Sequence, residues 1–466
     1  MARTRVVDLV VVLPGIMGSR LADADGRAVW DLSGGALWRG LRTLGGSLNR
    51  LRLPKDLGDA HPGDGIVPVG LMPDVHAIPG IWQPVDGYTD LLTWLERNFT
   101  VSPGENLLPF PYDWRLSCRY NAHRLGATLA RELPRWQASA PERRDARVVL
   151  LCHSMGGLIA RHWVERLGGH EVTRRLITLG TPHRGSLAAL DHLVNGLRKG
   201  WGPLGIDLTA FARSLPSLHQ LAPDYACVET PQGLAYARDL PGLPGVDPAL
   251  LADAAAFHAD LRTAANRPAP TPLHAVTGIR QPTHTTARLT GADLTPLWLI
   301  DGADERGDGT VPRLAARPAN ADLSGYAVDE SHTPCEQHGA IQNNPGVRDA
   351  LAGLLGQDRP FHRDGEEDAV PLGVLAPSFL DPGAPYEVAV TIPADTEDHD
   401  ALHLTAELRP ADGEEPLSRT LRPLGEGRYT ATFPSPLPGA YRLAVRVTDR
   451  PETTVTALSL VGGAGE

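Results

Sequence analysis

The stretch VVLLCHSMGGLIARHW, from Val148 to Trp163, decides the fold that the rest of the chain must support. The four apolar residues at 148–151 predict a buried strand, and the apolar residues from Met155 onward recur at helical spacing. Ser154 therefore falls on a sharp turn between a strand and a helix. Such a turn lifts the serine hydroxyl clear of the sheet and points the N–H groups at the start of the helix toward a developing negative charge.

This arrangement matches the nucleophile elbow of the α/β-hydrolases, whose usual pattern is Gly-x-Ser-x-Gly. Cys152 stands where the first glycine is usual, and Gly156 stands at the second glycine. The strand and the helix approach each other closely at the first position, so it needs a small residue, and cysteine is small enough. The elbow alone is moderate support for a serine nucleophile, because a nucleophile also needs partners elsewhere in the chain.

Composition limits the classes of function that the chain can have. Its 466 residues are enough for two or three domains, and 42% hydrophobic with 21% charged residues is ordinary for a globular protein. The net charge of -11 disfavours nucleic acid and anionic membrane surfaces, which bind basic faces. No apolar run approaches the ~18 residues of a membrane span.

The cysteines and the N-terminal segment indicate a cytoplasmic protein. The apolar run near the N-terminus is interrupted by Asp8 and is followed by no small-residue cleavage pattern, so it predicts a buried strand rather than a signal peptide. The cysteines have no metal-ligand spacing, and one of them lies inside the elbow, so we expect free thiols. These cysteines are Cys118, Cys152, Cys227 and Cys335.

A second loop could complete an oxyanion hole. The apolar run from Val6 to Leu13 is typical of a parallel strand that is covered on both faces, and it ends in PGIMGS at 14–19. A glycine-bracketed loop at the carboxyl end of a strand is where an α/β-hydrolase places its second oxyanion donor. We expect the Ile16 N–H to be that donor, and a plain β-turn is the alternative.

A serine nucleophile needs a base and an acid that orients the base. In α/β-hydrolases these residues follow the chain order Ser, Asp or Glu, His, and Ser154, Asp308 and His338 satisfy it. His332 is a rival base, since it also follows a predicted strand, whereas His183 comes too early. The spacing leaves both His332 and His338 open. The acidic loop around Asp308 lacks the full calcium-binding pattern, so we expect no metal.

Five short motifs in a shared order resemble the lecithin:cholesterol acyltransferase family, which includes lysosomal phospholipase A2 and phospholipid:diacylglycerol acyltransferase. They are VLPGIMGS (12–19), PYDWR (111–115), HSMGG (153–157), GDGTV (307–311) and HGAIQ (338–342). The resemblance implies that Ser154 is the nucleophile, Asp308 the acid and His338, rather than His332, the base. It also implies that the backbone N–H groups of Ile16 and Met155 form the oxyanion hole.

The chain departs from the family in two respects. Secreted members carry a disulfide-closed lid, and the cysteines for it are absent here. Residues 187–268 show no obvious match either, so the identity of the substrate does not transfer.

We predict an α/β-hydrolase domain over 1–358, with a lid insertion at about 29–83 and a helical cap insertion at about 187–268. The charged stretch 359–370 predicts a linker. Hydrophobic residues alternate at period two through 371–466, which favours an immunoglobulin-like β-sandwich.

Within the first domain, periodicity predicts helices at 84–99, 119–136 and 345–355. Short apolar runs at 273–278 and 295–300 predict strands that resume the central sheet. Trp30, Trp38 and Trp82 lie in the lid region, where exposed tryptophans would suit a cover over an apolar substrate, although core packing explains each one singly.

The predicted function is that of a serine esterase or lipase, or an O-acyltransferase, acting on lipid or other acyl esters through an acyl-enzyme. We expect no cofactor. The alternatives are a dedicated acyltransferase to an alcohol acceptor and a catalytically weak binding protein that uses the sandwich. The lid implies transient contact with a membrane or lipid surface, and the sequence identifies no protein partner for the sandwich.

Overall fold

The computed structural model describes residues 3–31, 51–73, 75, 84–199, 206–240, 242–262, 271–318, 326–329, 332–356, 370–411 and 413–462. A parallel sheet lies at the centre, with the strand order β17–β12–β7–β6–β1–β5. Its strands are β1 (Leu9–Leu13), β5 (Leu107–Pro109), β6 (Val148–His153), β7 (Thr173–Leu179), β12 (Thr271–Val276) and β17 (Tyr326–Asp329).

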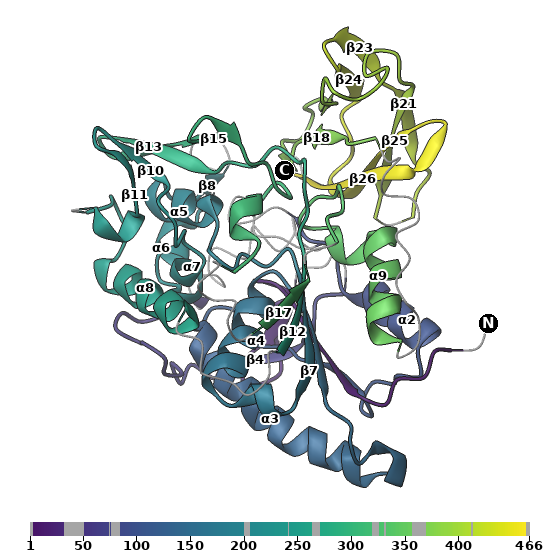
Figure 1. Ribbon diagram of the computed structural model, residues 1–466. Coiled ribbons are helices and arrows are strands. Elements are labelled where there is room, and N and C mark those ends of the chain that lie inside the picture. Colours follow the sequence, from purple (N-terminus) through teal and green to yellow (C-terminus); the bar gives the residue numbers. More distant parts are fainter. Residues whose placement is uncertain are drawn as a thin grey trace.

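Helices cover both faces of this sheet (Figure 1). They are α3 (Cys118–Ala138) and α4 (Met155–Arg166) on one face, and α2 (Thr89–Asn98) and α9 (Pro345–Leu355) on the other. In β1, Leu9, Val11 and Leu13 belong to the cluster that contains α3 and α4, whereas Val10 and Val12 belong to the cluster that contains α2 and α9. The strand is apolar throughout because both of its faces are buried. The mixed α/β architecture with a central parallel sheet fits the predicted α/β-hydrolase fold.

The direction in which strands are added reverses at β1, because β5 pairs on one side of it and β6 on the other. In open parallel sheets, the crevice beyond the carboxyl ends of the strands at such a reversal is the usual ligand site. Gly15 and Ile16 follow β1 and Ser154 follows β6, so the two predicted parts of the site meet at this crevice.

The predicted helical cap contains helices and also part of a sheet. Its elements are α5 (Leu187–Val194), β8 (Arg198–Lys199), β9 (Ile206–Asp207), α6 (Thr209–Ala212), α7 (Pro216–Gln220), β10 (Val228–Thr230), β11 (Gly233–Ala235) and α8 (Pro248–Arg262). Strand β10 pairs with β13 (Thr286–Thr290), which forms a hairpin with β14 (Asp293–Leu297).

The prediction that residues 295–300 return to the central sheet is therefore wrong. They lie in β14 and in β15 (Leu299–Ile300), which pairs with β16 (Ala303–Asp304) in a separate hairpin. A short apolar run indicates a strand but carries no information about which strand it pairs with.

A small antiparallel sheet follows β1 within the predicted lid region. It consists of β2 (Ser19–Ala22), β3 (Ala28–Trp30) and β4 (Val67–Leu71). Trp30 is fully buried and donates its indole N–H to the Met17 carbonyl at 2.9 Å, so it is a core residue. Trp38 and Trp82 lie outside the described residues, as does nearly all of the predicted linker.

The C-terminal region forms two sheets, with the orders β18–β20–β24–β23 and β19–β26–β25–β21–β22, which share one hydrophobic cluster. The ladders are antiparallel except for the pair β19–β26. The strands are β18 (Gly373–Leu375), β19 (Phe379–Leu380), β20 (Tyr386–Thr391), β21 (Leu404–Pro410), β22 (Leu417–Thr420), β23 (Arg422–Gly425), β24 (Arg428–Phe433), β25 (Gly439–Val447) and β26 (Arg450–Val461). We call this region the β-domain. Its immunoglobulin-like character stays a prediction.

Among the described residues, no helix is long and apolar enough to cross a membrane.

The two small positions of the elbow differ in what they tolerate. A Cβ atom on Gly156 would lie 2.6 Å from the Pro14 carbonyl oxygen and 2.9 Å from Leu13 Cβ, closer than packed atoms allow. The side chain of Cys152, in contrast, is buried within the cluster that includes α3 and α4. The contact between α4 and the end of β1 thus requires glycine at 156 but accommodates cysteine at 152.

We expect Gly156→Ala to lower the free energy of unfolding by about 1–3 kcal/mol, because backbone atoms cannot move aside as a flexible side chain can. Urea unfolding measures the change. The control is Gly439→Ala, whose Cβ would meet its nearest atom, Tyr441 Cε2, at 3.8 Å. Equal stabilities for the two variants would contradict the close approach.

Candidate active site

Three side chains from separate loops form a hydrogen-bonded chain at the carboxyl edge of the sheet. His338 Nε2 lies 3.0 Å from Ser154 Oγ, and His338 Nδ1 lies 2.8 Å from Asp308 Oδ2. A carboxylate can only accept, so Nδ1 carries the hydrogen and Nε2 accepts from the serine hydroxyl. Each of the three residues is at most 1% exposed. This is the geometry in which a histidine can take the proton of a serine nucleophile.

Ser154 has a backbone conformation that a non-glycine residue rarely adopts, with φ 52° and ψ -127°. Such a conformation costs about 1–3 kcal/mol and persists only where its surroundings hold it. The Ser154 N–H donates to the Leu179 carbonyl at 2.9 Å, and its carbonyl accepts from Thr181 Oγ1 at 2.9 Å. These bonds hold the serine at the start of α4, where the helix dipole favours negative charge.

The loop GDGTV holds the carboxylate of Asp308 in place. Its Oδ1 accepts the N–H groups of Thr310 at 3.0 Å and Val311 at 2.7 Å, while its backbone oxygen accepts the His338 N–H at 2.7 Å. Gly180, with φ 57°, passes so close that a Cβ would lie 2.9 Å from Asp308 Oδ2. The Asp308 carboxylate is thereby oriented toward the His338 ring.

His332, the rival base, occupies a different place. Its backbone oxygen accepts the Thr277 N–H at 3.1 Å, beside the end of β12, whereas His338 contacts the serine hydroxyl directly.

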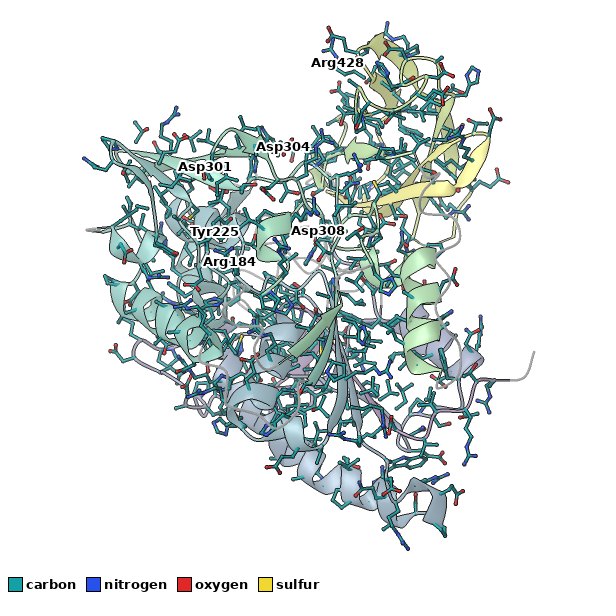
Figure 2. All side chains as sticks on the ribbon, in the orientation of Figure 1. Arg184, Tyr225, Asp301, Asp304, Asp308 and Arg428 are labelled. Carbon is teal, nitrogen blue, oxygen red and sulfur yellow. The ribbon has the colours of Figure 1, made fainter. Side chains whose placement is uncertain are left out.

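The exposed Asp301 and Asp304 lie on the outer β15–β16 hairpin, away from Asp308 (Figure 2). No cluster of three metal-ligating side chains occurs in the described part of the chain.

The PGIMGS loop lies against Ser154. A Cβ on Gly15 would be 3.0 Å from Ser154 Cβ. Met155 is the first residue of α4, so its N–H has no acceptor within the helix. Ile16, on the adjoining loop, is buried at the same crevice. The structure thus brings both predicted oxyanion donors to the immediate neighbourhood of Ser154.

Aromatic residues brace this loop through its carbonyl groups. The Tyr112 hydroxyl donates to the Pro14 carbonyl at 2.8 Å, and the Trp114 indole N–H donates to the Ser19 carbonyl at 3.2 Å. Arg115 and Asp113 form a buried ion pair next to them, with 2.7 Å between Nη2 and Oδ2. The PYDWR motif therefore supports the loop and is not part of the hydrogen-bonded chain of Ser154, His338 and Asp308.

A second hydrogen-bonded chain, which the sequence did not indicate, connects the two halves of the site. His153 Nε2 lies 3.0 Å from the His338 carbonyl oxygen, which can only accept, so Nε2 carries the hydrogen. Nδ1 then accepts from the Tyr88 hydroxyl at 2.9 Å, and the Tyr88 oxygen accepts the Gly15 N–H at 2.8 Å. Burial raises the pKa of Tyr88, which keeps this hydroxyl protonated. His153 stands inside the HSMGG motif, but Tyr88 looked like an ordinary apolar helix residue.

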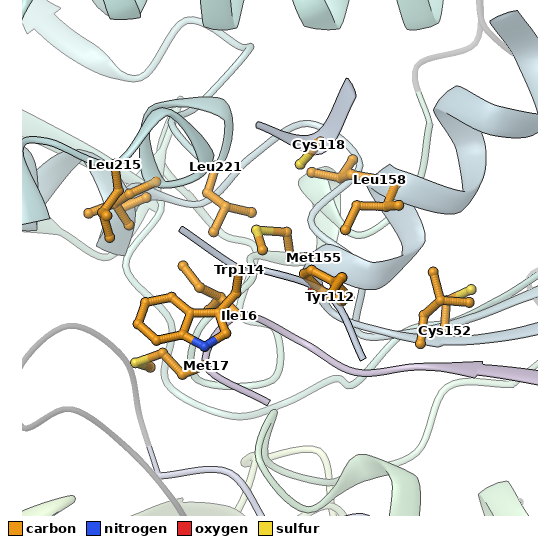
Figure 3. Packing of buried hydrophobic residues seen from close by; sticks show 14 of the residues in the cluster. Ile16, Met17, Tyr112, Trp114, Cys118, Cys152, Met155, Leu158, Leu215 and Leu221 are labelled. Carbon is orange, nitrogen blue, oxygen red and sulfur yellow. The ribbon is translucent and has the colours of Figure 1, made fainter. Parts of the chain in front are cut away.

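Apolar side chains pack around Met155, the residue that follows Ser154 (Figure 3). Ile16 and Met17 follow β1, and Trp114 follows β5. Leu215 and Leu221 flank helix α7 of the predicted cap (Figure 3). All five are at most 1% exposed and belong to one cluster. Met155, next to Ser154, is therefore part of a closely packed apolar cluster.

Glu336 is a buried acid two residues before His338. Its carboxylate accepts the N–H groups of Thr456 at 2.7 Å and Gln337 at 2.9 Å, and the Asn344 side-chain N–H at 3.2 Å. Burial, with a smaller contribution from the nearby Asp86, raises the pKa of Glu336 to about 7.

Comparison with known proteins agrees with the resemblance predicted from the motifs. The chain matches the family Lecithin:cholesterol acyltransferase over residues 81–232, which confirms the resemblance for that part. The match includes residues 187–232, so the expectation that the predicted cap has no counterpart in the family is wrong for this part of it. The match indicates acyl-ester chemistry, as a hydrolase or an acyltransferase. No curated protein matches the chain.

Three solved structures illustrate the range of structural similarity. The mature form of the Bacillus licheniformis lipase BlEst2 has 13% identity and a TM-score of 0.35, over 75% of this chain and 92% of that one. Its propeptide form has the same identity and score, over 97% and 73%. A putative glycoside hydrolase from Bacteroides vulgatus has 16% identity and a TM-score of 0.16, over 19% and 17%.

We expect Tyr88→Phe to reduce ester turnover, because it leaves the buried Gly15 N–H without its acceptor and His153 without its donor. An unsatisfied buried group costs about 1–3 kcal/mol. We expect the PGIMGS loop to shift so that the Gly15 N–H finds another acceptor, and this shift should lower kcat roughly tenfold. Steady-state kinetics measures this. Tyr386→Phe removes a buried hydroxyl from the β-domain core and serves as the control. Equal kcat values in the two variants would refute the bracing role of Tyr88.

We expect the free energy of unfolding to fall as the pH rises from about 4.5 to about 7, in part because of Glu336. In this window the folded chain keeps a proton that the unfolded chain releases, so the folded state loses stability as the pH increases. The contribution is at most roughly 3 kcal/mol.

Glu336→Gln should therefore make urea unfolding less dependent on pH across this window. The control is Glu387→Gln at an exposed position on β20. An unchanged pH dependence in Glu336→Gln would show that the acid titrates alike in the folded and unfolded chains.

Proposed function

We propose that this chain, which is similar to the lecithin:cholesterol acyltransferase family over residues 81–232, is a serine acyl hydrolase or O-acyltransferase acting on lipid or other acyl esters. The observation that carries the proposal is the His338 ring, which is hydrogen-bonded to Ser154 Oγ on one side and to Asp308 Oδ2 on the other. A serine without such a base is a poor nucleophile at neutral pH.

In the first half of the reaction, Ser154 Oγ attacks the acyl carbonyl carbon and its proton passes to His338 Nε2. Asp308 stabilises the imidazolium through Nδ1–H. The tetrahedral intermediate collapses, the bond to the leaving alkoxide breaks, and His338 returns the proton to that oxygen. The acyl group is then bonded to Ser154 Oγ.

In the second half, water or an alcohol attacks the acyl-enzyme while His338 takes its proton. Collapse restores the Ser154 hydroxyl and releases an acid or a new ester. The N–H groups of Ile16 and Met155 are the proposed donors to the oxyanion in both halves, each contributing roughly 3 kcal/mol to transition-state stabilisation.

An apolar acyl chain is the substrate part that best suits the surroundings of Ser154. The buried side chains of Met17, Leu215 and Leu221 lie in the cluster that includes Ile16 and Met155. Leu215 and Leu221 come from the predicted cap, where they flank α7. The cap is therefore the proposed determinant of acyl preference.

We expect Ser154→Ala to abolish turnover of p-nitrophenyl esters and labelling by a fluorophosphonate probe, because both require the serine oxygen. Retained turnover would sink the assignment. Failure of the probe to label the unaltered protein would favour a binding protein. With an added alcohol, the ratio of ester to free acid distinguishes an acyltransferase from a hydrolase.

The two candidate bases can be separated by replacing each one alone. His338→Ala should lower kcat by roughly 10⁴-fold or more, since the triad acts as a unit. His332→Ala serves as the matched control and should leave kcat far less affected. The reverse result would transfer the role of base to His332.

A further inference from the structure

The loop that carries His338 contacts the β-domain directly, and the loop that carries Asp308 contacts it through Gln281. Gln281, which is fully buried, donates its side-chain N–H to the Leu372 carbonyl at 2.9 Å and accepts the Val374 N–H at 3.1 Å. Its backbone N–H donates to the Gly307 carbonyl at 2.9 Å, and the Gly307 N–H donates back at 3.2 Å. One residue therefore joins the backbone at β18 to the residue that precedes Asp308.

The residues just before His338 make a second set of contacts with the same domain. Glu336 accepts the Thr456 N–H of β26 at 2.7 Å, and the Gln337 side chain donates to the Val374 carbonyl at 3.0 Å. The Cys335 thiol donates to the Leu372 carbonyl at 3.1 Å. Three consecutive side chains thus bind backbone groups of the β-domain.

A third contact holds the residue that follows His338. The Asp86 N–H donates to the Gly339 carbonyl at 2.8 Å. The carboxylate of Asp86, which is 4% exposed, accepts hydrogen bonds from Arg442 on β25, with Nε at 3.2 Å. Arg442 is thereby connected to the catalytic loop through a single intermediate residue.

These contacts matter because the His338 segment has no ladder of its own. Residues 332–340 form neither helix nor strand, and the 3-10 helix η7 (Ile341–Asn343) begins only after them. The partner groups on β18 and β26 belong to ladders, whose geometry is regular and stiff. The position of the ring relative to Ser154 Oγ therefore depends on the β-domain as well as on the central sheet.

We propose that the β-domain is a positioning element of the active site, which holds the Asp308 and His338 loops at Ser154 through Gln281 and Arg442. The proposal rests on the proposed function, because it assumes that Asp308 and His338 are the acid and the base. It assigns the β-domain a role within this chain, whereas the alternative is that the domain only adds stability.

Arg442→Ala tests the proposal in the full-length protein. Displacing a catalytic group by about 1 Å can cost 10²-fold in rate, so we expect a fall in kcat of roughly tenfold for a short p-nitrophenyl ester. The KM should change less than twofold, since Arg442 does not line the apolar surroundings of Ser154. Fluorophosphonate labelling of Ser154 should slow in proportion to kcat.

The matched control is Arg446→Ala, four residues further along the same strand and exposed. Arg442→Lys, which keeps the charge, should recover part of the lost kcat. Asp86→Asn should lower kcat as well, and its combination with Arg442→Ala should be less than additive if both act through the same contact. Gln281→Leu tests the Asp308 side of the junction in the same assays.

The outcomes separate the two proposals. If the unaltered protein is neither active nor labelled at Ser154, the proposed function fails. If it is active and labelled, and Arg442→Ala and Gln281→Leu retain the kcat of Arg446→Ala, the positioning role is overturned. A loss of urea stability with kcat unchanged at temperatures where the variants are folded would also overturn it.

Discussion

The His338 ring is the point on which the arrangement of this molecule depends. Its two nitrogens join Ser154 and Asp308, which are far apart in the sequence. Ser154, Asp308 and His338 each stand on a separate loop. Each bond tolerates only a few tenths of an ångström, so the loops must be held from outside. Glycine at 15 lets the backbone of its loop lie against Ser154, and glycine at 180 lets the backbone after β7 lie against Asp308. Neither position has room for a larger side chain.

Support for the site comes from buried polar groups as well as from Ser154, Asp308 and His338 themselves. Tyr112 and Trp114 hold the carbonyl groups of the PGIMGS loop, and the path from Gly15 through Tyr88 and His153 joins that loop to the backbone of His338. In a buried environment each such bond has no competing water, so losing one partner leaves the other unsatisfied. The PGIMGS loop and the His338 loop are thereby coupled.

The expectations that succeeded concern segments with strong local signals. The helix at 345–355 begins at a proline and has one apolar face, and it is observed with those bounds. The strand leading into Ser154 was visible because it is apolar on both faces. The pairing of 295–300 was mistaken, since a short run looks alike in either sheet. Tyr88 was missed because the partners of its hydroxyl, the Gly15 N–H and the His153 ring, lie 73 and 65 positions away in the chain and leave no local pattern.

The sequence by itself determined the order of the parts: a strand, a serine on a sharp turn, an acid and then a histidine, followed by a region of alternating hydrophobicity. These features depend on neighbouring residues, and a linear pattern records them. Only the tertiary structure decided that His338 rather than His332 contacts Ser154, and that the β-domain binds Gln281 and Glu336. These contacts join residues that are 91, 120 and 184 positions apart in the chain, and they depend on how loops fold back over the sheet. No local spacing encodes that path.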